Sequence, residues 1–312
     1  MCHQSPVPAG RFAPSPTGLL HFGSLIAAMG SYLQARSSGA RWLLRIEDTD
    51  PPREMPGAAA AILRTLQTYG FRHDGDVLYQ SRRARHYDAA LQQLARAGLL
   101  YACDCSRKQI REAAARTAYP AAYPGTCRER GLPLDGPYAL RLRLPRDAAV
   151  SLQDGIQGLY RQNVREACGD FVLKRRDGLY AYQLAVVVDD GLCGISDVVR
   201  GADLLDNTPR QILLQQALGL PTPRYWHLPL IVNGDGEKLS KQTYAAPLDD
   251  NPLPQLQQAW CSLGQRKAAT AGAQTVAAFW DLALQHWQMQ RIPPGPLPQP
   301  DSADLNHPPP QV

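Results

Sequence analysis

The feature that most restricts the fold of this chain is a repeated alternation of strand-like and helix-like segments. Residues 41–47 ("RWLLRIE") have the pattern of a strand, and residues 24–39 place apolar side chains on one helical stripe that ends at a glycine. Helical patterns recur at 58–70 and 83–98, with an extended segment at 76–81 between them. Such alternation is typical of a parallel sheet that helices cover on both faces. The sequence therefore predicts a doubly wound α/β domain with a Rossmann-like parallel sheet.

Composition indicates a globular protein. The 312 residues, 44% of them hydrophobic, can bury one large core or a core and a smaller module. No apolar run approaches the ~18 residues of a membrane span, and the first ten residues lack the charged start and apolar centre of a secretory signal. We therefore expect a cytoplasmic protein that does not cross a membrane. The net charge of +5 favours a polyanionic partner, but it is also common in proteins that bind none.

The alternation stops between residues 103 and 165, where cysteines and short strand patterns predict an inserted α+β module. It returns near Asp170, and "NTPRQILLQQALG" predicts a helix with Thr208 as N-cap and Gln211 closing a capping box. The predicted organisation is an α/β domain in two halves (9–102 and 166–245), the inserted module (103–165), a short helical region (246–292) and a proline-rich, disordered tail (293–312).

Residues 11–24 ("RFAPSPTGLLHFGS") lie where the first strand should lead into the first helix. In doubly wound folds, ligands bind beyond the carboxyl ends of the strands, where helix N-termini offer N–H groups to anions. Gly18 and Gly23 would let a phosphorylated ligand approach the backbone, while Thr17 and His21 would donate hydrogen bonds to it. Taken alone, such a stretch is more often a surface turn, because short glycine patterns have many false positives.

A second stretch, residues 236–242 ("GEKLSKQ"), strengthens the functional interpretation. The pair "HFGS" and "KLSKQ" closely resembles the two ATP-binding signatures of class I aminoacyl-tRNA synthetases. The segments "RFAPSPTG", "RIEDTDPPRE", "YQLAVVVDD" and "VRGADLLDNTPRQ" are similar, in the same order, to the glutamyl-tRNA synthetase branch. The resemblance implies that the α/β domain is catalytic and binds ATP with Mg²⁺. The implied ATP-binding residues are Thr17, Gly18, His21, Gly23, Ser24, Lys238, Ser240 and Lys241, with His21 and Lys241 as the catalytic residues. Ser24 departs from the signature, since many members have a second histidine there.

The reaction of this class needs alignment and charge stabilisation rather than a side-chain nucleophile, because a substrate carboxylate attacks the α-phosphorus of ATP. Glutamate carries two carboxylates and one ammonium, so a selective site should present about two cations and one anion. The resemblance implies that Glu47 takes the α-ammonium and Arg200 the side-chain carboxylate. The implied glutamate-binding residues are Arg11, Phe12, Ala13, Pro14, Ser15, Glu47, Tyr182 and Arg200. Asp189 and Asp190 could order this site or an RNA end, although paired acids before a glycine turn are more often structural.

Three cysteines in the inserted module have the spacing of metal ligands. Cys103 and Cys105 form a C-x-C pair and Cys127 follows after a loop, whereas structural zinc prefers four ligands. The resemblance implies Tyr123 as the fourth ligand of one zinc ion, and Cys168 is the chemically more ordinary alternative. Seven cysteines spread unevenly over a long chain do not look like a disulfide framework, so the alternative to a metal site is three reduced cysteines without a metal. Basic residues around them, Arg107, Lys108, Arg111, Arg116, Arg128 and Arg130, could face an RNA backbone.

About seventy residues follow Gln242, whereas a full glutamyl-tRNA synthetase continues into a large helical domain that reads the anticodon. In this respect, and in the tyrosine of the cysteine motif, the chain is similar to a truncated branch of the family. That branch activates glutamate without tRNA and esterifies it to queuosine in the anticodon of tRNA(Asp). The resemblance thus implies glutamate, ATP and queuosine-containing tRNA(Asp) as partners, and we expect a monomer. The alternatives are conventional glutamyl-tRNA synthetase-like charging, an inactive RNA-binding paralogue, and a ligase that passes glutamate to a carrier.

Overall fold

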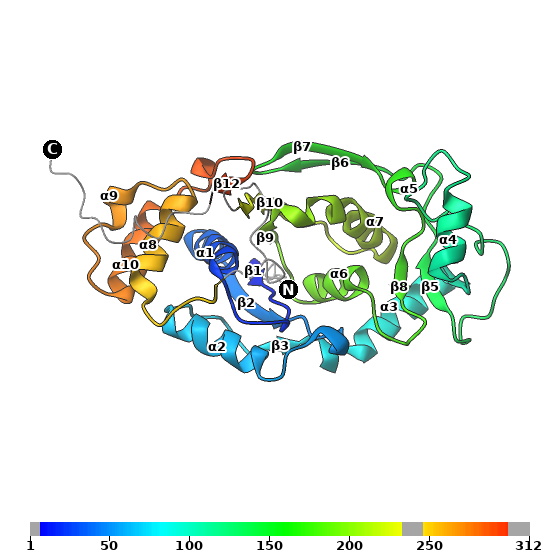
Figure 1. Cartoon of the computed structure of the whole chain (residues 1–312), viewed down its shortest axis with the longest axis horizontal. Helices are drawn as coiled ribbons and strands as arrows, with labels where there is room; N and C mark the ends of the chain where they lie inside the picture. The colour runs from blue at the N-terminus through cyan, green and yellow to red at the C-terminus, as the bar shows by residue number, and fades with distance from the viewer. Residues whose placement is uncertain (1–6, 233–245, 299–312) are drawn as a thin grey trace, which may run out of the picture.

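A parallel sheet forms the centre of the molecule, for which a computed structural model describes residues 7–232 and 246–298 (Figure 1). Its strands are β1 (Ala9–Phe12), β2 (Arg41–Ile46), β3 (Leu78–Tyr79), β9 (Asp197–Gly201) and β10 (Arg224–Leu228). Parallel pairing joins β1 to β2, β2 to β3 and β9 to β10. The Ser196 N–H donates to the Ala9 carbonyl at 2.9 Å and so connects the β1 side to the β9 side. The strand order is β3-β2-β1-β9-β10. From β1 the chain adds strands on one side of the sheet, and from β9 it adds them on the other side, which confirms the predicted doubly wound fold.

Helices cover both faces of this sheet, and a separate hydrophobic core lies between the sheet and the helices on each face. One layer comprises α1 (Phe22–Ser37), α2 (Ala58–Thr68), α8 (Pro252–Ser262), α9 (Lys267–Thr270) and α10 (Val276–His286). The other comprises α3 (Ala84–Arg96), α6 (Tyr182–Leu192) and α7 (Thr208–Leu218). The predicted apolar stripe of α1 is buried, and Gly39 follows the helix with φ +68°. Gly30 lets α1 approach β10 closely, because a Cβ there would lie 2.9 Å from the Leu228 side chain.

The segment between the two halves of the sheet lies at the end of the molecule opposite the C-terminal helices (Figure 1). It contains an antiparallel sheet of β4 (Leu100–Cys103), β5 (Ala139–Leu142) and β8 (Val172–Lys174), with α4 (Arg107–Ala114) beside it. An antiparallel hairpin of β6 (Ala149–Asp154) and β7 (Gly158–Asn163) follows, and α5 (Val164–Ala167) continues from it. The hairpin reaches back along the molecule toward β10, so the module and the parallel sheet are in contact.

The capping prediction for α7 is wrong. A 3₁₀ helix, η3 (Ala202–Asn207), runs directly into α7, so Thr208 is the first residue of α7 and not its N-cap. The Thr208 hydroxyl accepts a hydrogen bond from Arg200 Nη2 at 2.8 Å instead of capping the helix. The Thr208 hydroxyl, which the local sequence pattern assigned to capping the helix, is therefore used in a tertiary hydrogen bond with Arg200.

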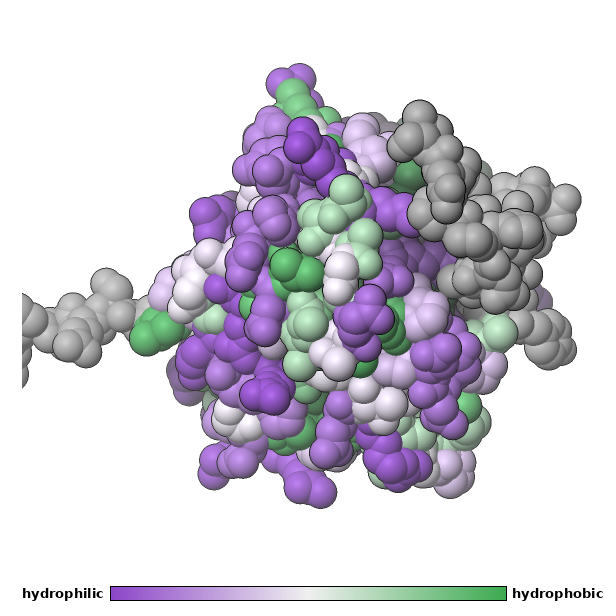
Figure 2. Space-filling view, turned by 90° about the vertical axis from the view of Figure 1, so that its left-hand side faces the viewer, coloured by the Kyte–Doolittle hydropathy of each residue, from purple (hydrophilic) through white to green (hydrophobic). Residues whose placement is uncertain are grey.

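Short elements complete the fold. The 3₁₀ helices η1 (Pro51–Arg53), η2 (Gln80–Arg82) and η5 (Met289–Arg291) link larger elements, and β11 (Ile231–Val232) pairs with β12 (Leu297–Pro298). Within the two described ranges, no helix has both the length and the apolar character needed to cross a membrane. The end of the molecule formed by the C-terminal helices is largely hydrophilic, with a small hydrophobic group near its middle (Figure 2). Small apolar groups of this kind are common on protein surfaces.

Candidate active site

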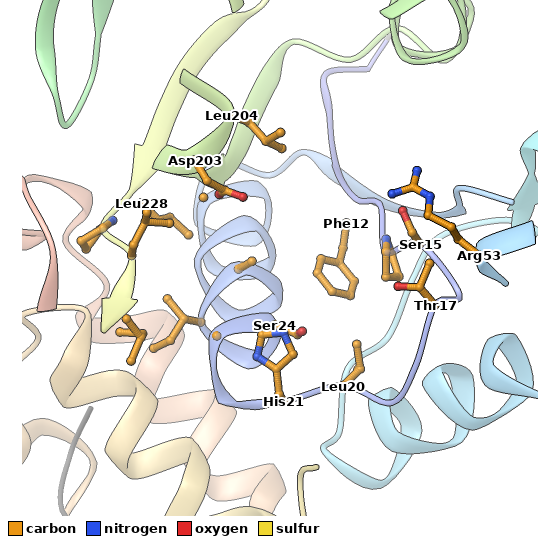
Figure 3. A pocket seen from close by; sticks show the side chains of 18 residues that line it. Phe12, Ser15, Thr17, Leu20, His21, Ser24, Arg53, Asp203, Leu204 and Leu228 are labelled. Carbon is orange, nitrogen blue, oxygen red and sulfur yellow. The ribbon is translucent and has the colours of Figure 1, made fainter. Parts of the chain in front are cut away.

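A cavity of about 670 Å³ lies at the topological switch point of the sheet, between β1 and β9. The end of β1, the start of α1, η3 and the end of β10 surround it (Figure 3). His21 occupies the N-cap position of α1 with extended backbone (φ −124°, ψ 175°), and Ser24 lies in the first turn of that helix. Figure 3 shows the His21 and Ser24 side chains close together at this helix end. A helix N-terminus that opens into a large cavity offers N–H groups to an anionic ligand.

The structure brings much of the predicted ATP-binding set to this cavity. Thr17, His21, Gly23 and Ser24 line it, and Gly18 follows Thr17 in the same loop. Lys238, Ser240 and Lys241 lie outside the described residues. The chain on either side of them borders the cavity, since Ile231 lines it and Pro247 pairs with His21.

A second, smaller cavity of about 220 Å³ adjoins the first. Both are lined by Ser15, Thr17 and Arg53, so the two spaces meet along the loop after β1. Glu47 and Tyr182, two of the predicted glutamate-binding residues, line the smaller cavity. Phe12 and Pro14 line the larger one, and Ala13 lies between them in the same loop. The candidate site therefore consists of a larger cavity at the N-terminus of α1 and a smaller cavity beside the Glu47 carboxylate.

An ion-pair network that sequence reasoning recognised only in part supports the smaller cavity. The Arg11 Nε lies 3.3 Å from both carboxylate oxygens of Asp190, and Arg45 Nη1 lies 2.5 Å from Asp190 Oδ1. Arg45 Nη2 also donates to Glu47 Oε1 at 3.1 Å. Arg45 was not predicted, although its position two residues before Glu47 on one strand places both side chains on one face. Asp190, on α6, thus orders Arg11 and Arg45, and Arg45 in turn holds Glu47, which lines the smaller cavity.

Burial and neighbouring charges act against each other in this network. Burial favours the neutral form of Asp190, but Arg11 and Arg45 outweigh it and hold the pKa of that carboxyl below its ordinary value. At Glu47 burial dominates and raises the pKa, while the Arg45 guanidinium opposes the rise. Burial also raises the pKa of the Tyr182 hydroxyl. A cationic group entering the smaller cavity would therefore favour the ionised form of Glu47.

The two neighbouring acids have different roles. Asp189 accepts hydrogen bonds from Gln80 Nε2 and the Tyr87 hydroxyl, both at 2.8 Å, and from Arg83 Nε at 2.5 Å. These donors come from η2, from α3 and from Arg83 between them, so Asp189 connects α3 to α6. Asp189 is therefore structural, as paired acids usually are, whereas Asp190 belongs to the site.

Arg200, the predicted partner of the glutamate side chain, is buried on β9 and, like Arg11, is not among the residues that line either cavity. Its Nη2 donates to Thr208 Oγ1 at 2.8 Å, and its Nε donates to His227 Nε2 at 3.1 Å. Its Nη1 has no hydrogen-bond partner in the described part of the chain. His227 and Thr208 were not predicted as site residues, although a histidine inside the apolar strand of residues 224–228 is a signal that could have found the first.

The three predicted cysteine ligands meet in the inserted module. The Sγ atoms of Cys103, Cys105 and Cys127 all lie within 4.8 Å of one another. The Tyr123 hydroxyl lies 3.3 Å from Cys103 Sγ and accepts from the Cys127 N–H at 2.9 Å. The Cys168 thiol points elsewhere and donates to its own helix, to the Val164 carbonyl at 3.4 Å. Three thiols and one phenol oxygen around one point fit a tetrahedral zinc ion.

The surroundings favour the thiolate at Cys103 but not at Cys105, because burial raises the pKa of the Cys105 thiol to about 12. Burial would raise the pKa of the Cys103 thiol, but hydrogen bonds with Tyr123 and Arg141 lower it below its ordinary value. The Arg141 guanidinium also lies 3.7 Å from the centroid of the Tyr123 ring. Gly169 lets the chain pass Tyr123, because a Cβ at Gly169 would lie 2.2 Å from the Tyr123 carbonyl oxygen. The cluster is thus built by residues from β4, the 123–127 turn and the segment before β8.

Five of the six predicted basic residues around the cluster divide into two groups, and the sixth, Lys108, is exposed on α4 with its Nζ 3.9 Å from Glu112 Oε1. Arg128 pairs with Asp170 at 2.9 Å and Arg130 with Asp104 at 2.6 Å, so both hold the module together. Arg107, Arg111 and Arg116 are exposed on or just after α4. These three make no ion pair within residues 7–232 and 246–298, and they form the exposed basic surface of the module.

Comparison with known proteins agrees with this geometry. Residues 9–254 match the model of the catalytic domain of class I tRNA synthetases (E and Q). A protein from Xanthomonas campestris pv. campestris (strain 8004), named glutamyl-Q tRNA(Asp) synthetase, is 53% identical over 285 residues, which is 91% of this chain and 93% of that protein. A protein of the same name from Chromobacterium violaceum is 52% identical over 293 residues, 93% of this chain and 97% of its own. The crystal structure of glutamate-tRNA synthetase from Elizabethkingia anophelis superimposes with a TM-score of 0.80 at 25% identity, covering 96% of this chain and 69% of that one.

Proposed function

The chain belongs to the family of class I tRNA synthetases for glutamate and glutamine, and on that premise we propose that it is a ligase that attaches glutamate to queuosine in the anticodon of tRNA(Asp). The observation that carries the proposal is the pair of adjoining cavities, one at the N-terminus of α1 and one beside Glu47 and Tyr182. Two separate substrates that must react with each other need such neighbouring sites. The relatives that share about half of their residues with this chain bear the name of this activity.

The first step joins glutamate to ATP. The α-carboxylate of glutamate attacks the α-phosphorus, a new O–P bond forms, and the bond to the departing pyrophosphate breaks. Thr17, His21 and Ser24 would donate to the phosphates in the larger cavity, together with the N–H groups of α1. Lys238, Ser240 and Lys241, which were predicted from the sequence, would add positive charge and a hydroxyl. Mg²⁺ bound with the nucleotide would reduce the repulsion between the phosphates and the incoming carboxylate.

The smaller cavity would bind glutamate. Glu47, held by Arg45, would accept the α-ammonium, and the Tyr182 hydroxyl lines the same space. Arg200 would bind the side-chain carboxylate through Nη1, the nitrogen that has no partner among the described residues. Arg11 would support the α-carboxylate side, since its Nε is occupied by Asp190 and its two terminal nitrogens have no hydrogen bond in the described chain. Two cations and one anion would thus match the charges of glutamate.

The second step transfers glutamate to the RNA. A hydroxyl of the cyclopentenediol of queuosine attacks the glutamyl carbonyl carbon, an ester forms, and AMP leaves with the electrons of the broken bond. The exposed basic surface of Arg107, Arg111 and Arg116 would contact phosphates of the anticodon stem and loop. A zinc ion held by Cys103, Cys105, Tyr123 and Cys127 would stabilise the module that carries these arginines. We also propose that the protein acts as a monomer, which size-exclusion chromatography with light scattering would test.

Two assays test the proposal. The purified protein should exchange labelled pyrophosphate into ATP when glutamate is present and RNA is absent. It should then transfer labelled glutamate to tRNA(Asp) that contains queuosine but not to tRNA(Asp) from cells unable to make it. Efficient charging of tRNA(Glu) would favour a conventional synthetase, and absence of exchange would favour an inactive RNA-binding paralogue.

A further inference from the structure

Arg200 is held by more contacts than its predicted role in binding one carboxylate requires. Its Nε donates to His227, its Nη2 donates to Thr208, and the same Nη2 lies 3.4 Å from the Leu204 carbonyl. The guanidinium also lies over the Tyr225 ring, 5.5 Å from its centroid. These contacts fix the plane of the guanidinium and leave Nη1 as its one nitrogen without a protein partner in the described chain.

The contact with His227 defines the proton position on the imidazole. A guanidinium nitrogen can only donate, so His227 Nε2 must present its lone pair to Arg200 Nε. The ring proton then lies on Nδ1 and is donated to Asp154 Oδ2 at 2.6 Å. With the opposite tautomer, two N–H groups would face each other between His227 and Arg200.

Asp154 is fixed in the orientation that selects this tautomer. Its Oδ1 accepts three backbone N–H groups, from Ile156 at 3.0 Å, Gln157 at 2.8 Å and His227 at 3.1 Å. Its Oδ2 is therefore directed to the imidazole. Asp154 and His227 are only 1% and 0% exposed, so water does not compete for these hydrogen bonds.

The three residues come from separate parts of the fold. Asp154 ends β6 in the hairpin of the inserted segment, His227 lies on β10, and Arg200 lies on β9. The hairpin turn is fastened to β10 by a second contact, in which Gln157 Nε2 donates to the His227 carbonyl at 2.8 Å. The hairpin thus controls the orientation of a side chain in the parallel sheet.

We propose that Asp154 and His227 are positioning residues, which act through Arg200 and hold its Nη1 ready for the side-chain carboxylate of glutamate. The proposal rests on the proposed function, which assigns that carboxylate to Arg200. Neither residue touches the substrate in this arrangement. Their loss should therefore weaken the binding of glutamate and its discrimination from glutamine, while ATP binding in the larger cavity should be unaffected.

Asp154→Asn is the sharpest variant, because it changes charge and hydrogen-bonding character without changing shape. The asparagine amide has one oxygen, which would face the three backbone N–H groups and leave its NH₂ toward His227. The ring would then take the opposite tautomer and present an N–H to Arg200. In pyrophosphate exchange, we expect the KM for glutamate to rise by about 10- to 100-fold, by analogy with the loss of the hydrogen-bond partner that orients a metal-binding histidine. The KM for ATP should stay constant, and the preference for glutamate over glutamine should narrow.

Two further variants separate positioning from general destabilisation. His227→Leu removes the acceptor, whereas His227→Gln can present its Oε1 to Arg200 Nε and should recover part of the affinity for glutamate. Tyr225→Phe is the matched control, since it removes a buried hydrogen bond to Gln215 but keeps the ring beneath Arg200. It should lower the melting temperature without changing the KM for glutamate.

The outcomes are distinguishable. If the wild-type protein does not exchange pyrophosphate with glutamate, the proposed function itself fails. If it does, and Asp154→Asn keeps both the wild-type KM for glutamate and the wild-type selectivity, the positioning role is overturned. If the His227→Leu protein does not fold, the test depends on Asp154→Asn alone. Circular dichroism would verify that the Asp154→Asn protein is folded.

Discussion

Arg45 and Asp190 form a buried ion pair, with Arg45 Nη1 2.5 Å from Asp190 Oδ1, that joins strand β2 of the parallel sheet to helix α6. Their side chains are only 3% and 6% exposed, and Asp190 also holds Arg11. Removing one member of such a network leaves buried charges without compensation, which costs far more than the loss of a surface pair. This relationship makes Asp190 important for both stability and the shape of the candidate glutamate site.

The first prediction follows from that network. Asp190→Asn should lower the free energy of unfolding by about 3–5 kcal/mol, because Arg11 and Arg45 lose their common counter-charge. Urea denaturation would measure the change. Asp88→Asn, which removes a partly exposed pair with Lys174, is the control and should cost less than about 1 kcal/mol. Equal losses in the two variants would contradict the central role of Asp190.

The second prediction concerns pH. Burial lowers the pKa of His227 in the folded protein, although Asp154 opposes this, so the unfolded chain binds a proton more readily than the folded one. The contribution of His227 to stability should be complete above its unfolded pKa of about 6.5 and should be lost as pH falls from there toward the lower folded pKa. His227→Gln should therefore reduce the pH dependence of the melting temperature over that window. His286→Gln, at an exposed site, should leave most of it in place.

The third prediction tests the adenylation chemistry. Lys241→Ala should reduce kcat for pyrophosphate exchange by about 10²- to 10³-fold, as expected when one charge-stabilising group is lost. Lys267→Ala, an exposed lysine on α9, is the control and should exchange at the wild-type rate. Unchanged exchange in Lys241→Ala would remove this lysine from the mechanism.

The fourth prediction concerns the metal. Elemental analysis should find about one zinc ion per chain, because the cluster can make one tetrahedral site. Cys103→Ser and Tyr123→Phe should both weaken zinc binding strongly, while Cys168→Ser should not, since the Cys168 thiol donates to its own helix. Cys261→Ser, at an exposed position, controls for the general effect of losing a thiol. Full zinc occupancy in Tyr123→Phe would exclude the tyrosine as the fourth ligand.

The sequence was sufficient to predict elements whose signal is local. The apolar stripe of α1 and the alternation of strands and helices were confirmed, because periodicity depends on neighbouring residues alone. The three cysteines were also brought together as predicted, since a C-x-C pair limits the geometry strongly.

Relationships between distant residues were harder to predict. Nothing near Arg45 indicates that its partner lies 145 residues further along the chain, and burial of an arginine in an apolar strand is unusual without one. Thr208 is a second example. Its local sequence context predicted a helix cap, but in the folded chain its hydroxyl accepts a hydrogen bond from Arg200. The chain of Asp154, His227 and Arg200 depends on how a hairpin docks against the sheet, which periodicity does not specify.

The last prediction concerns RNA binding. Replacing Arg107, Arg111 or Arg116 with alanine should weaken transfer of glutamate to tRNA(Asp) and leave pyrophosphate exchange unchanged, since these arginines are exposed on the module and do not line either cavity. Each lost phosphate contact should reduce the slope of log affinity against log salt by about 0.7 to 0.9. Filter binding over a range of salt concentrations would measure the slope. Arg266→Ala is the matched control and should keep the wild-type slope, since this exposed arginine directly precedes α9, which lies at the opposite end of the molecule (Figure 1). If all four variants bound tRNA(Asp) with the wild-type salt dependence, the α4 surface would not be the contact, and the anticodon would have to approach the cavities from another side.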